Sequence, residues 1–379
     1  DPYDNETDNY QQDHFQLFYN QSLNNALTLS TAFFLTKGKG YYEQYKADEA
    51  YSKYGLPDVG NSDFVRQLWL DNDFYGSVFS LQHKGKQTQT TLGGAITSYR
   101  GDHIGKVIWA AGGMPSPIHQ WYDNDAVKND FNIYLKEQYQ LNPAWHLFGD
   151  LQFRHVRYRI DGFRDNPGLS VDNDFSFFNP KLGISYNQKG WKGYFSYGHA
   201  GKEPNRDDFE AGILRQPKAE KLHDFEAGIE QTSGNCNWSA TFYYMHYRNQ
   251  LVLTGMINDV GAYTRTNIPK SFRAGVELQA STKFTHWLNA SVNMAFSRNK
   301  VLDFTEFIDD YDNGGQKATQ FSKPDIAFSP GIVGGSSINF IPGANTEISI
   351  LSKHVGKQYL DNTQNENRVL DEFSVHDLR

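Results

Sequence analysis

The segment FRAGVELQ at residues 272–279 alternates strictly between apolar and polar side chains. One side of the extended chain is apolar, and the other side carries Arg273 and Glu277. Alternation with a period of two residues indicates a β-strand rather than a helix. The segments WHLFGDLQFR at 145–154 and LHDFEAGIE at 222–230 repeat the pattern, again with ionisable groups along the polar side.

The polar side of these segments must be in contact with water, because an ionised group loses its hydration in an apolar core. Repeated strands of this kind are typical of a transmembrane β-barrel, whose apolar side faces lipid and whose polar side faces a wet lumen. Hydrophobic residues make up only 38% of the 379 residues. No apolar run of about 18 residues exists, which excludes helical membrane spans. The aromatic content of 15% fits girdles at two membrane interfaces.

Short turns alternate with long connections along the chain. Residues 189–190 and 342–344 are short turns, and the long connections include residues 40–66, 101–128, 201–219 and 250–267. We count roughly fifteen strands, with short periplasmic turns and long extracellular loops as in outer-membrane barrels. The four-strand repeat of a β-propeller is missing. The sequence therefore predicts an all-β fold, a large antiparallel transmembrane β-barrel that forms one domain over residues 1–379.

A run of four short segments carries a family resemblance: FSYGHA at 195–200, GKEPNR at 201–206, PKAEK at 217–221 and FEAG at 225–228. The run resembles the barrel of TonB-dependent outer-membrane receptors of the Bacteroidetes type. Ala219 stands where that family more often has a proline. Three further segments also look like family segments: LTKGKGYYEQYK at 35–46, LDNDFYG at 70–76 and YLDNT at 359–363.

The resemblance implies a barrel of about 22 strands when complete, with the N-terminal plug domain and the last strands outside this chain. It implies a receptor in the outer membrane of a Gram-negative cell that binds a scarce ligand at its extracellular loops. Import to the periplasm would draw energy from the TonB complex, acting through the plug. The expected cargo is a ferric siderophore or another iron chelate, with haem, cobalamin, glycans and peptides as alternatives. Lipopolysaccharide, other outer-membrane lipid and a surface lipoprotein are further expected partners.

The long connections hold the candidate ligand-binding residues. Aromatic rings can stack on a flat chelate, so we expect ligand contacts from His103, His119, Trp121, Tyr122, Tyr41 and Tyr42. The alternative interpretation is packing within the loops or at the membrane interface. On the polar side of the strands, the residues expected to face the plug, or merely to solvate a watery interior, are Asp224, Glu226, Glu230, Arg273 and Glu277.

Other functional classes receive little support. The net charge of −8 gives no nucleic-acid footprint, and the single Cys236 cannot form an internal disulfide. No HExxH spacing, Walker loop or GxGxxG motif is present, so we expect no metal site, no cofactor and no enzymatic activity. The alternative functions are a passive outer-membrane porin and a non-enzymatic surface binding protein. A soluble protein would turn its charged faces outward and its apolar faces inward.

Overall fold

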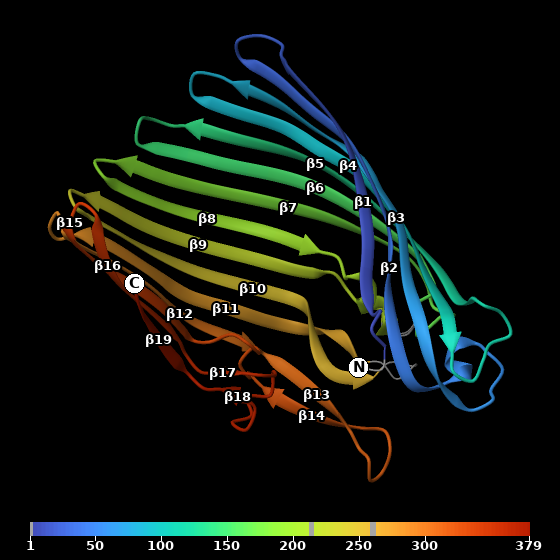
Figure 1. Ribbon diagram of the computed structural model, residues 1–379. Coiled ribbons are helices and arrows are strands. Elements are labelled where there is room, and N and C mark those ends of the chain that lie inside the picture. Colours follow the sequence, from blue (N-terminus) through green and yellow to red (C-terminus); the bar gives the residue numbers. More distant parts are fainter. Residues whose placement is uncertain (1–2, 212–215, 258–262) are drawn as a thin grey trace. The chain divides into compact units, whose positions relative to one another are not determined.

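Fifteen strands hydrogen-bond into one antiparallel sheet in the computed structural model of this chain (Figure 1). The structure describes residues 3–211, 216–257 and 263–379. The sheet runs in chain order from β1 to β12 and ends with β15, β16 and β19. The bounds of its strands are β1 Thr7–Ser22, β2 Leu27–Ala50, β3 Asn61–Lys84, β4 Thr88–Ala110, β5 His119–Gln140, β6 Trp145–Asp161, β7 Ser170–Gln188, β8 Trp191–Lys202, β9 Glu220–Ser233, β10 Cys236–Ile257, β11 Tyr263–Lys283, β12 Leu288–Val301, β15 Ile332–Gly343, β16 Thr346–Val355 and β19 Phe373–Leu378. The predicted all-β, antiparallel class is confirmed.

Outside the large sheet, the described residues also form four short strands and two 3₁₀ helices. Strands β13 (Asp303–Asp309) and β14 (Gln316–Ser322) form a hairpin, and β17 (Gln358–Tyr359) pairs with β18 (Val369–Leu370). The 3₁₀ helices are η1 (Tyr51–Tyr54) and η2 (Arg206–Ala211). In the part of the chain that the structure describes, no helix has the length and apolarity needed to cross a membrane.

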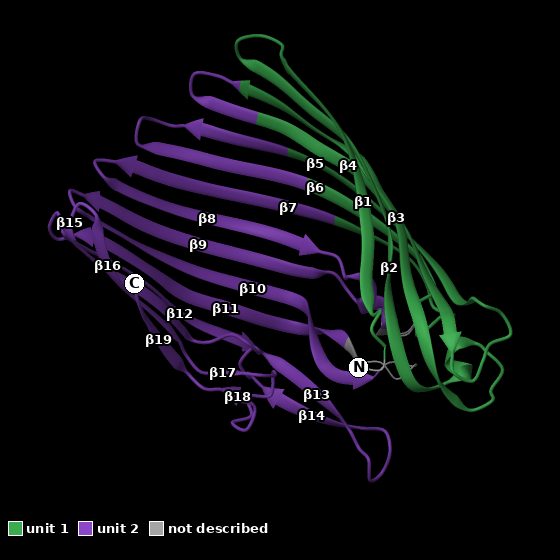
Figure 2. Cartoon of the chain, in the orientation of Figure 1, with its two compact units in different colours: residues 1–83, 91–134, 153–176 green, residues 84–90, 135–152, 177–379 purple. Residues whose placement is uncertain are grey.

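The chain forms two compact units (Figure 2). Unit 1 comprises residues 1–83, 91–134 and 153–176, and unit 2 comprises residues 84–90, 135–152 and 177–379. The boundary between the units crosses β3 to β7, so each of these strands contributes one part to each unit.

Within unit 2, the strand register sorts side chains into rows, because directly opposite residues point to the same side of an antiparallel sheet. One row joins Phe195, Ala227, Phe242, Val276 and Phe296 across β8 to β12. The three phenylalanines are 51%, 53% and 40% exposed. We call this side the apolar face. A continuous apolar surface of this kind must be covered by another apolar medium.

The opposite side of the same strands is polar. Its corresponding row joins Ser196, Glu226, Tyr243, Gly275 and Ser297. We call this side the polar face. The split between the two faces confirms the alternation that the sequence predicts for residues 222–230 and 272–279.

Aromatic pairs gather on unit 2 at the end of the sheet where the strands join through short turns. Trp191 lies 5.9 Å from Trp238, and the Trp238 indole nitrogen donates to Gln231 at 2.9 Å. Two further ring pairs lie beside short turns, Trp145–Tyr186 at 5.0 Å and Trp287–Phe340 at 5.4 Å. Amphipathic rings favour the boundary between hydrocarbon and water, so this row has the composition of an interfacial girdle.

Two of the connections predicted to be long loops consist mostly of strand. Only residues 51–60 and 111–118 lie outside strands in the segments 40–66 and 101–128. Beyond the apolar band both faces meet water, so the apolar–polar alternation disappears although the hydrogen-bonded ladder continues. A register shift between Lys46 and Glu49 accommodates the change, with Asp48 at a φ of 52°. The connections expected at 201–219 and 250–267 include residues 212–215 and 258–262, which lie outside the described residues.

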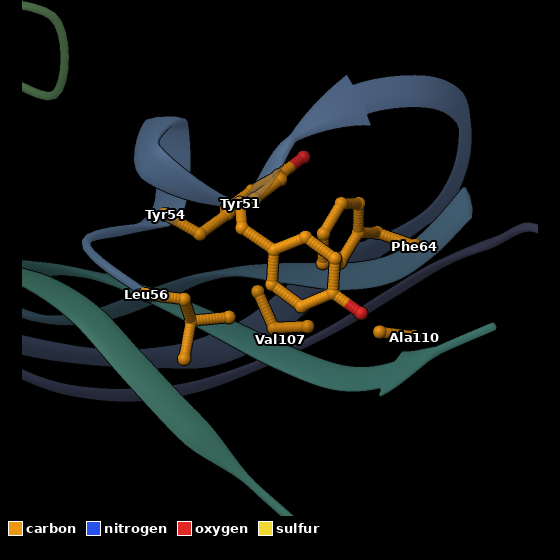
Figure 3. Close-up of a cluster of buried hydrophobic side chains, with 6 residues drawn as sticks. All are labelled: Tyr51, Tyr54, Leu56, Phe64, Val107 and Ala110. Carbon is orange, nitrogen blue, oxygen red and sulfur yellow. The ribbon is translucent and has the colours of Figure 1, made fainter. Parts of the chain in front are cut away.

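Small apolar cores stabilise the strand ends opposite the short turns. In unit 1, η1 places Tyr51 and Tyr54 against Phe64 and Val107, in a cluster that also contains Leu56 and Ala110 (Figure 3). In unit 2, the base of the β13–β14 hairpin is held by a second cluster, formed by Ile268, Val301, Phe304 and Ile326. These clusters bury apolar side chains at the strand ends, which favours the paired backbone there.

Candidate functional site

The polar face of unit 2 brings three of the predicted plug-facing residues around one hollow. Strands β9 and β11 position Glu226, Arg273 and Glu277 along a hollow of about 520 Å³. Tyr243 lies between them on β10, directly opposite both Glu226 and Gly275. The hollow therefore has a wall that carries charges of both signs.

Arg273 is held in place by neutral partners. Its Nη1 donates to Ser329 Oγ at 3.0 Å and to Asn299 Oδ1 at 3.5 Å. Ser329 in turn donates to the Ala327 carbonyl at 3.1 Å, and the Ala327 amide donates to Asn362 at 2.8 Å. A chain of hydrogen bonds thus links the Arg273 guanidinium to the segment that carries Asn362.

The carboxylates on this face lack cationic partners. Within the described residues, no ion pair involves Asp224, Glu226 or Glu277, and Asp224 Oδ1 is buried without a hydrogen-bond partner. Glu230 is different, because Lys192 Nζ lies 2.9 Å from its Oε1. Of the five predicted plug-facing residues, three carboxylates therefore have no cationic partner in the described part of the chain, and Glu230 has one.

Two cross-strand pairs of tyrosine and glycine shape the polar face. Tyr194 lies directly opposite Gly228, and a Cβ at Gly228 would lie 2.1 Å from the tyrosine ring. Tyr243 lies opposite Gly275, where a Cβ would lie 2.5 Å from the tyrosine hydroxyl. Both glycines leave room for a ring to lie flat against the sheet. The Gly228 in the segment FEAG thus has a packing reason.

In unit 1, three of the predicted ligand-binding residues converge on the cluster around η1. His119 Nε2 lies 2.7 Å from the Tyr54 carbonyl oxygen. Trp121 packs edge-on against Tyr54 at 4.9 Å and against Tyr122 at 5.0 Å. Burial, followed by the bond from the Tyr54 hydroxyl to Glu49, raises the pKa of Tyr54. His119 and Trp121 therefore stabilise a small core, whatever ligand contacts they also make.

The other three predicted ligand-binding residues are dispersed over β2 and β4. Tyr41 lies 4.6 Å from Trp69, and Lys106 Nζ lies 4.7 Å from the same indole ring. Tyr42 points to the other side of β2 and is 55% exposed, and His103 lies within β4. All six predicted ligand-binding residues lie in strands β2, β4 and β5 rather than in loops, which corrects their predicted placement. Their role in binding remains a prediction.

A buried ion pair near β11 has no counterpart among the sequence predictions. Asp208 in η2 is 1% exposed and accepts from Arg265 Nε at 2.7 Å and Nη2 at 2.9 Å. The Asn205 amide also donates to Asp208, at 2.6 Å. The segment GKEPNR supplies the turn before η2, but the cation lies 57 residues away in the sequence. No local pattern could have identified the pair.

Arg368 connects two further segments of unit 2. Its Nη1 lies 2.9 Å from Glu306 in β13 and 2.8 Å from Asp361. Both carboxylates sit in segments opposite the short-turn end of the sheet. In the described ranges, no set of His, Cys, Asp and Glu side chains is arranged to hold a metal ion.

Comparisons with known proteins agree on one family. The family model described as "TonB dependent receptor-like, beta-barrel" matches residues 1–379. No curated protein sequence matches the chain. Among solved structures, it is similar to the siderophore receptor PiuA from Acinetobacter baumannii, with a TM-score of 0.69 and 14% identity over 98% of this chain and 58% of that one.

Two further structures show the same fold. The copper transporter OprC matches with a TM-score of 0.73 and 12% identity over 97% of this chain and 56% of OprC. The ferric yersiniabactin uptake receptor FyuA from Yersinia pestis matches with a TM-score of 0.62 and 16% identity over 97% of this chain and 53% of FyuA. The chain therefore spans little more than half the length of these structures.

Proposed function

Because this chain belongs to the TonB-dependent receptor family and is an outer-membrane protein, we propose that it forms the wall and the extracellular binding surface of an uptake receptor. The cargo is a ferric siderophore or a comparable iron chelate. This choice is supported by the iron-related names of two of the similar structures, PiuA and FyuA. Energy for release into the periplasm comes from the TonB complex, through a plug domain that docks on the polar face. The whole of residues 1–379 acts as one barrel domain, although the chain forms two compact units.

The observation that carries the proposal is the set of carboxylates without cationic partners on the polar face. A charge in a partly enclosed site is costly unless another group compensates it. Asp224 and Glu226 lie on β9 and Glu277 lies on β11, with β10 between these strands, and together they offer three acceptors to the cationic side chains of a plug. A passive porin needs only a polar lining and no such set of acceptors for a docked domain.

Uptake by whole cells tests the proposal. Cells that lack the receptor gene are complemented with the full-length receptor and supplied with a ⁵⁵Fe-labelled hydroxamate siderophore, a ⁵⁵Fe-labelled catecholate siderophore or haem. We expect saturable accumulation of one of them, which a protonophore abolishes while surface binding persists. Accumulation that does not saturate and is insensitive to the protonophore would instead establish the porin function.

A pair of variants separates docking of the plug from binding of the cargo. The double variant Glu226→Gln with Glu277→Gln removes two unpaired carboxylates, so we expect slower uptake with unchanged surface binding. The matched control is Glu230→Gln, since Lys192 already neutralises that carboxylate, and its uptake should stay near the wild-type rate. Equal effects of the two changes would contradict docking of the plug on this part of the wall.

Tyr42→Ala tests the predicted ligand contact that is most open to solvent. We expect weaker surface binding of the labelled chelate with an unchanged heat-modifiable gel shift. Trp121→Ala is the contrasting variant, because loss of its packing on Tyr54 should reduce folding yield rather than binding alone.

A further inference from the structure

A row of cations crosses the apolar-face side of β9, β10 and β11. Lys221 lies directly opposite Arg248, and Arg248 lies directly opposite Lys270. All three side chains are exposed. Their positions continue the alternation that places Phe225, Phe242 and Leu278 on the apolar face. We call these three residues the cationic row.

The next row toward the short turns consists of histidines. His223 lies directly opposite His199 on one side and His246 on the other. The Tyr197 hydroxyl lies 2.9 Å from His223 Nδ1, and the His199 Nδ1 lies 2.9 Å from the Phe178 carbonyl oxygen. The sequence shows these histidines only as isolated residues. The strand register places them side by side, in a polar row between the cationic row and the apolar band.

An aromatic row lies directly below the histidines. It joins Tyr197, Phe225 and Tyr244, of which Phe225 is 41% and Tyr244 45% exposed. Along β9 and β10 the order is therefore the same: cation, imidazole, aromatic ring, then aliphatic and phenyl groups; on β11, Phe272 and Ala274 follow Lys270 instead. This is the order of polarity that a lipid molecule presents from its headgroup to its acyl chains.

The spacing along β10 places the cationic row just outside the hydrocarbon layer. Eight residues separate Trp238 in the girdle from His246 in the histidine row. At about 3.4 Å per residue and a strand tilt of about 40°, they span a height of about 21 Å. An outer-membrane barrel has an apolar band about 25 Å tall, so the cationic row lies at the level of the lipid headgroups on the side away from the short turns.

The cationic row is not neutralised by the protein. Within the described residues, Lys221, Arg248 and Lys270 form no ion pair. Three cations of unit 1 with the corresponding strand parity have carboxylate partners and serve as the comparison. Lys39 lies 2.6 Å from Asp71, Lys37 lies 3.9 Å from Asp73, and Arg157 lies 2.9 Å from Asp172.

We propose that the cationic row binds the phosphate groups of a phosphorylated lipid of the outer leaflet, whose acyl chains lie along the aromatic row and the apolar band. Arg248 supplies a planar pair of donors for phosphate oxygens, and the two lysines supply flanking point charges. A free phosphate ion would satisfy the cations but would leave the apolar surface directly below them uncovered. The charge pattern therefore favours a lipid over a soluble anion.

The test uses the full-length receptor in mild detergent and measures lipid binding by native mass spectrometry. The probes are bacterial lipid A with its phosphate groups and the same lipid A after chemical dephosphorylation. The variant is the triple substitution Lys221→Gln, Arg248→Gln, Lys270→Gln. The matched control is Lys37→Gln, Lys39→Gln, Arg157→Gln, which removes three cations that already have partners.

For the wild type we expect tighter binding of the phosphorylated lipid than of the dephosphorylated one. The triple variant should lose at least about tenfold in affinity for the phosphorylated lipid, since charge-assisted bonds are the strong ones. The control should change by less than about twofold, because its cations are engaged elsewhere. Equal binding of the two lipids by the wild type, or an unchanged triple variant, would overturn the proposal.

Competition by inorganic phosphate and a single-site variant complete the test. Displacement of the bound lipid by excess inorganic phosphate would show a phosphate site without lipid selectivity and would overturn the lipid assignment. If the heat-modifiable gel shift shows that the triple variant folds poorly, the affinity for the phosphorylated lipid is measured with Arg248→Gln alone. In that case Arg248→Lys should retain part of the binding. The result is independent of the proposed uptake function, because no transported ligand enters the assay.

Discussion

Replacing Asp208 by asparagine tests whether the buried ion pair anchors η2 and the turn before it. The substitution keeps the volume of the side chain but removes the negative charge that faces Arg265. Breaking a buried pair by removing one partner costs about 3–5 kcal/mol, because the other charge stays behind without compensation. Arg265 is 34% exposed and regains some hydration, so we expect the lower end of this range, about 3 kcal/mol.

The exposed pair of Arg157 and Asp172 gives a control with the same chemistry. Its guanidinium also binds the carboxylate through two nitrogen atoms, at 3.0 and 2.9 Å. Both side chains are more than half exposed, at 58% and 52%. Exposed pairs contribute about 0–1 kcal/mol. The two pairs therefore differ in burial while the bonded groups are the same.

Hydrogen exchange of backbone amides in the full-length receptor measures the difference. A loss of about 3 kcal/mol in local stability corresponds to about a hundredfold faster opening of residues 203–211 in Asp208→Asn. Asp172→Asn should accelerate exchange around residues 157–172 by no more than about fivefold. Similar changes in the two variants, or protected amides at 203–211 in Asp208→Asn, would refute the argument from burial.

Three further changes have defined outcomes. Gly228→Val should lower the heat-modifiable folded fraction, because its Cβ would collide with the Tyr194 ring. The turn at 310–315 should open as the pH falls below about 4, measured by exchange rates corrected for intrinsic chemistry. Bonds from the Asn313 side chain and from backbone amides lower the pKa of Asp310, so its contribution is present at higher pH and is lost on protonation. Arg368→Gln should increase proteolytic cleavage of the β13–β14 hairpin by a modest factor, since the side chain is 45% exposed.

The sequence predicts the strands of the membrane-facing region well and their extensions poorly. In residues 272–279 one face meets an apolar medium and the other meets polar surroundings, so selection leaves a period of two that can be read directly. Around Tyr41 and His103 both faces meet water, and the same ladder carries no such pattern. The sequence therefore predicts loops here, although the backbone stays paired.

The candidate site shows a similar division. Alternate residues of a strand point to opposite faces, so the sequence alone places Glu226, Arg273 and Glu277 on the polar face. The structure shows that all three line one hollow. The histidine row could not be predicted, because it depends on the register between strands that are linked through a long connection. The packing of Trp121 on Tyr54 depends on a contact across 67 positions of sequence, which no local rule contains.

The continuous pairing of β2 with β3 has a mechanical consequence. These strands have 24 residues each, and their ladder extends from Leu27 to Ala50 with one register shift. The hydrogen bonds along the ladder tie the two strands together, so we expect them to move as one arm. Any gating motion of this pair of strands is therefore expected at the one irregular point of the ladder, the register shift between Lys46 and Glu49, where Asp48 has a φ of 52°.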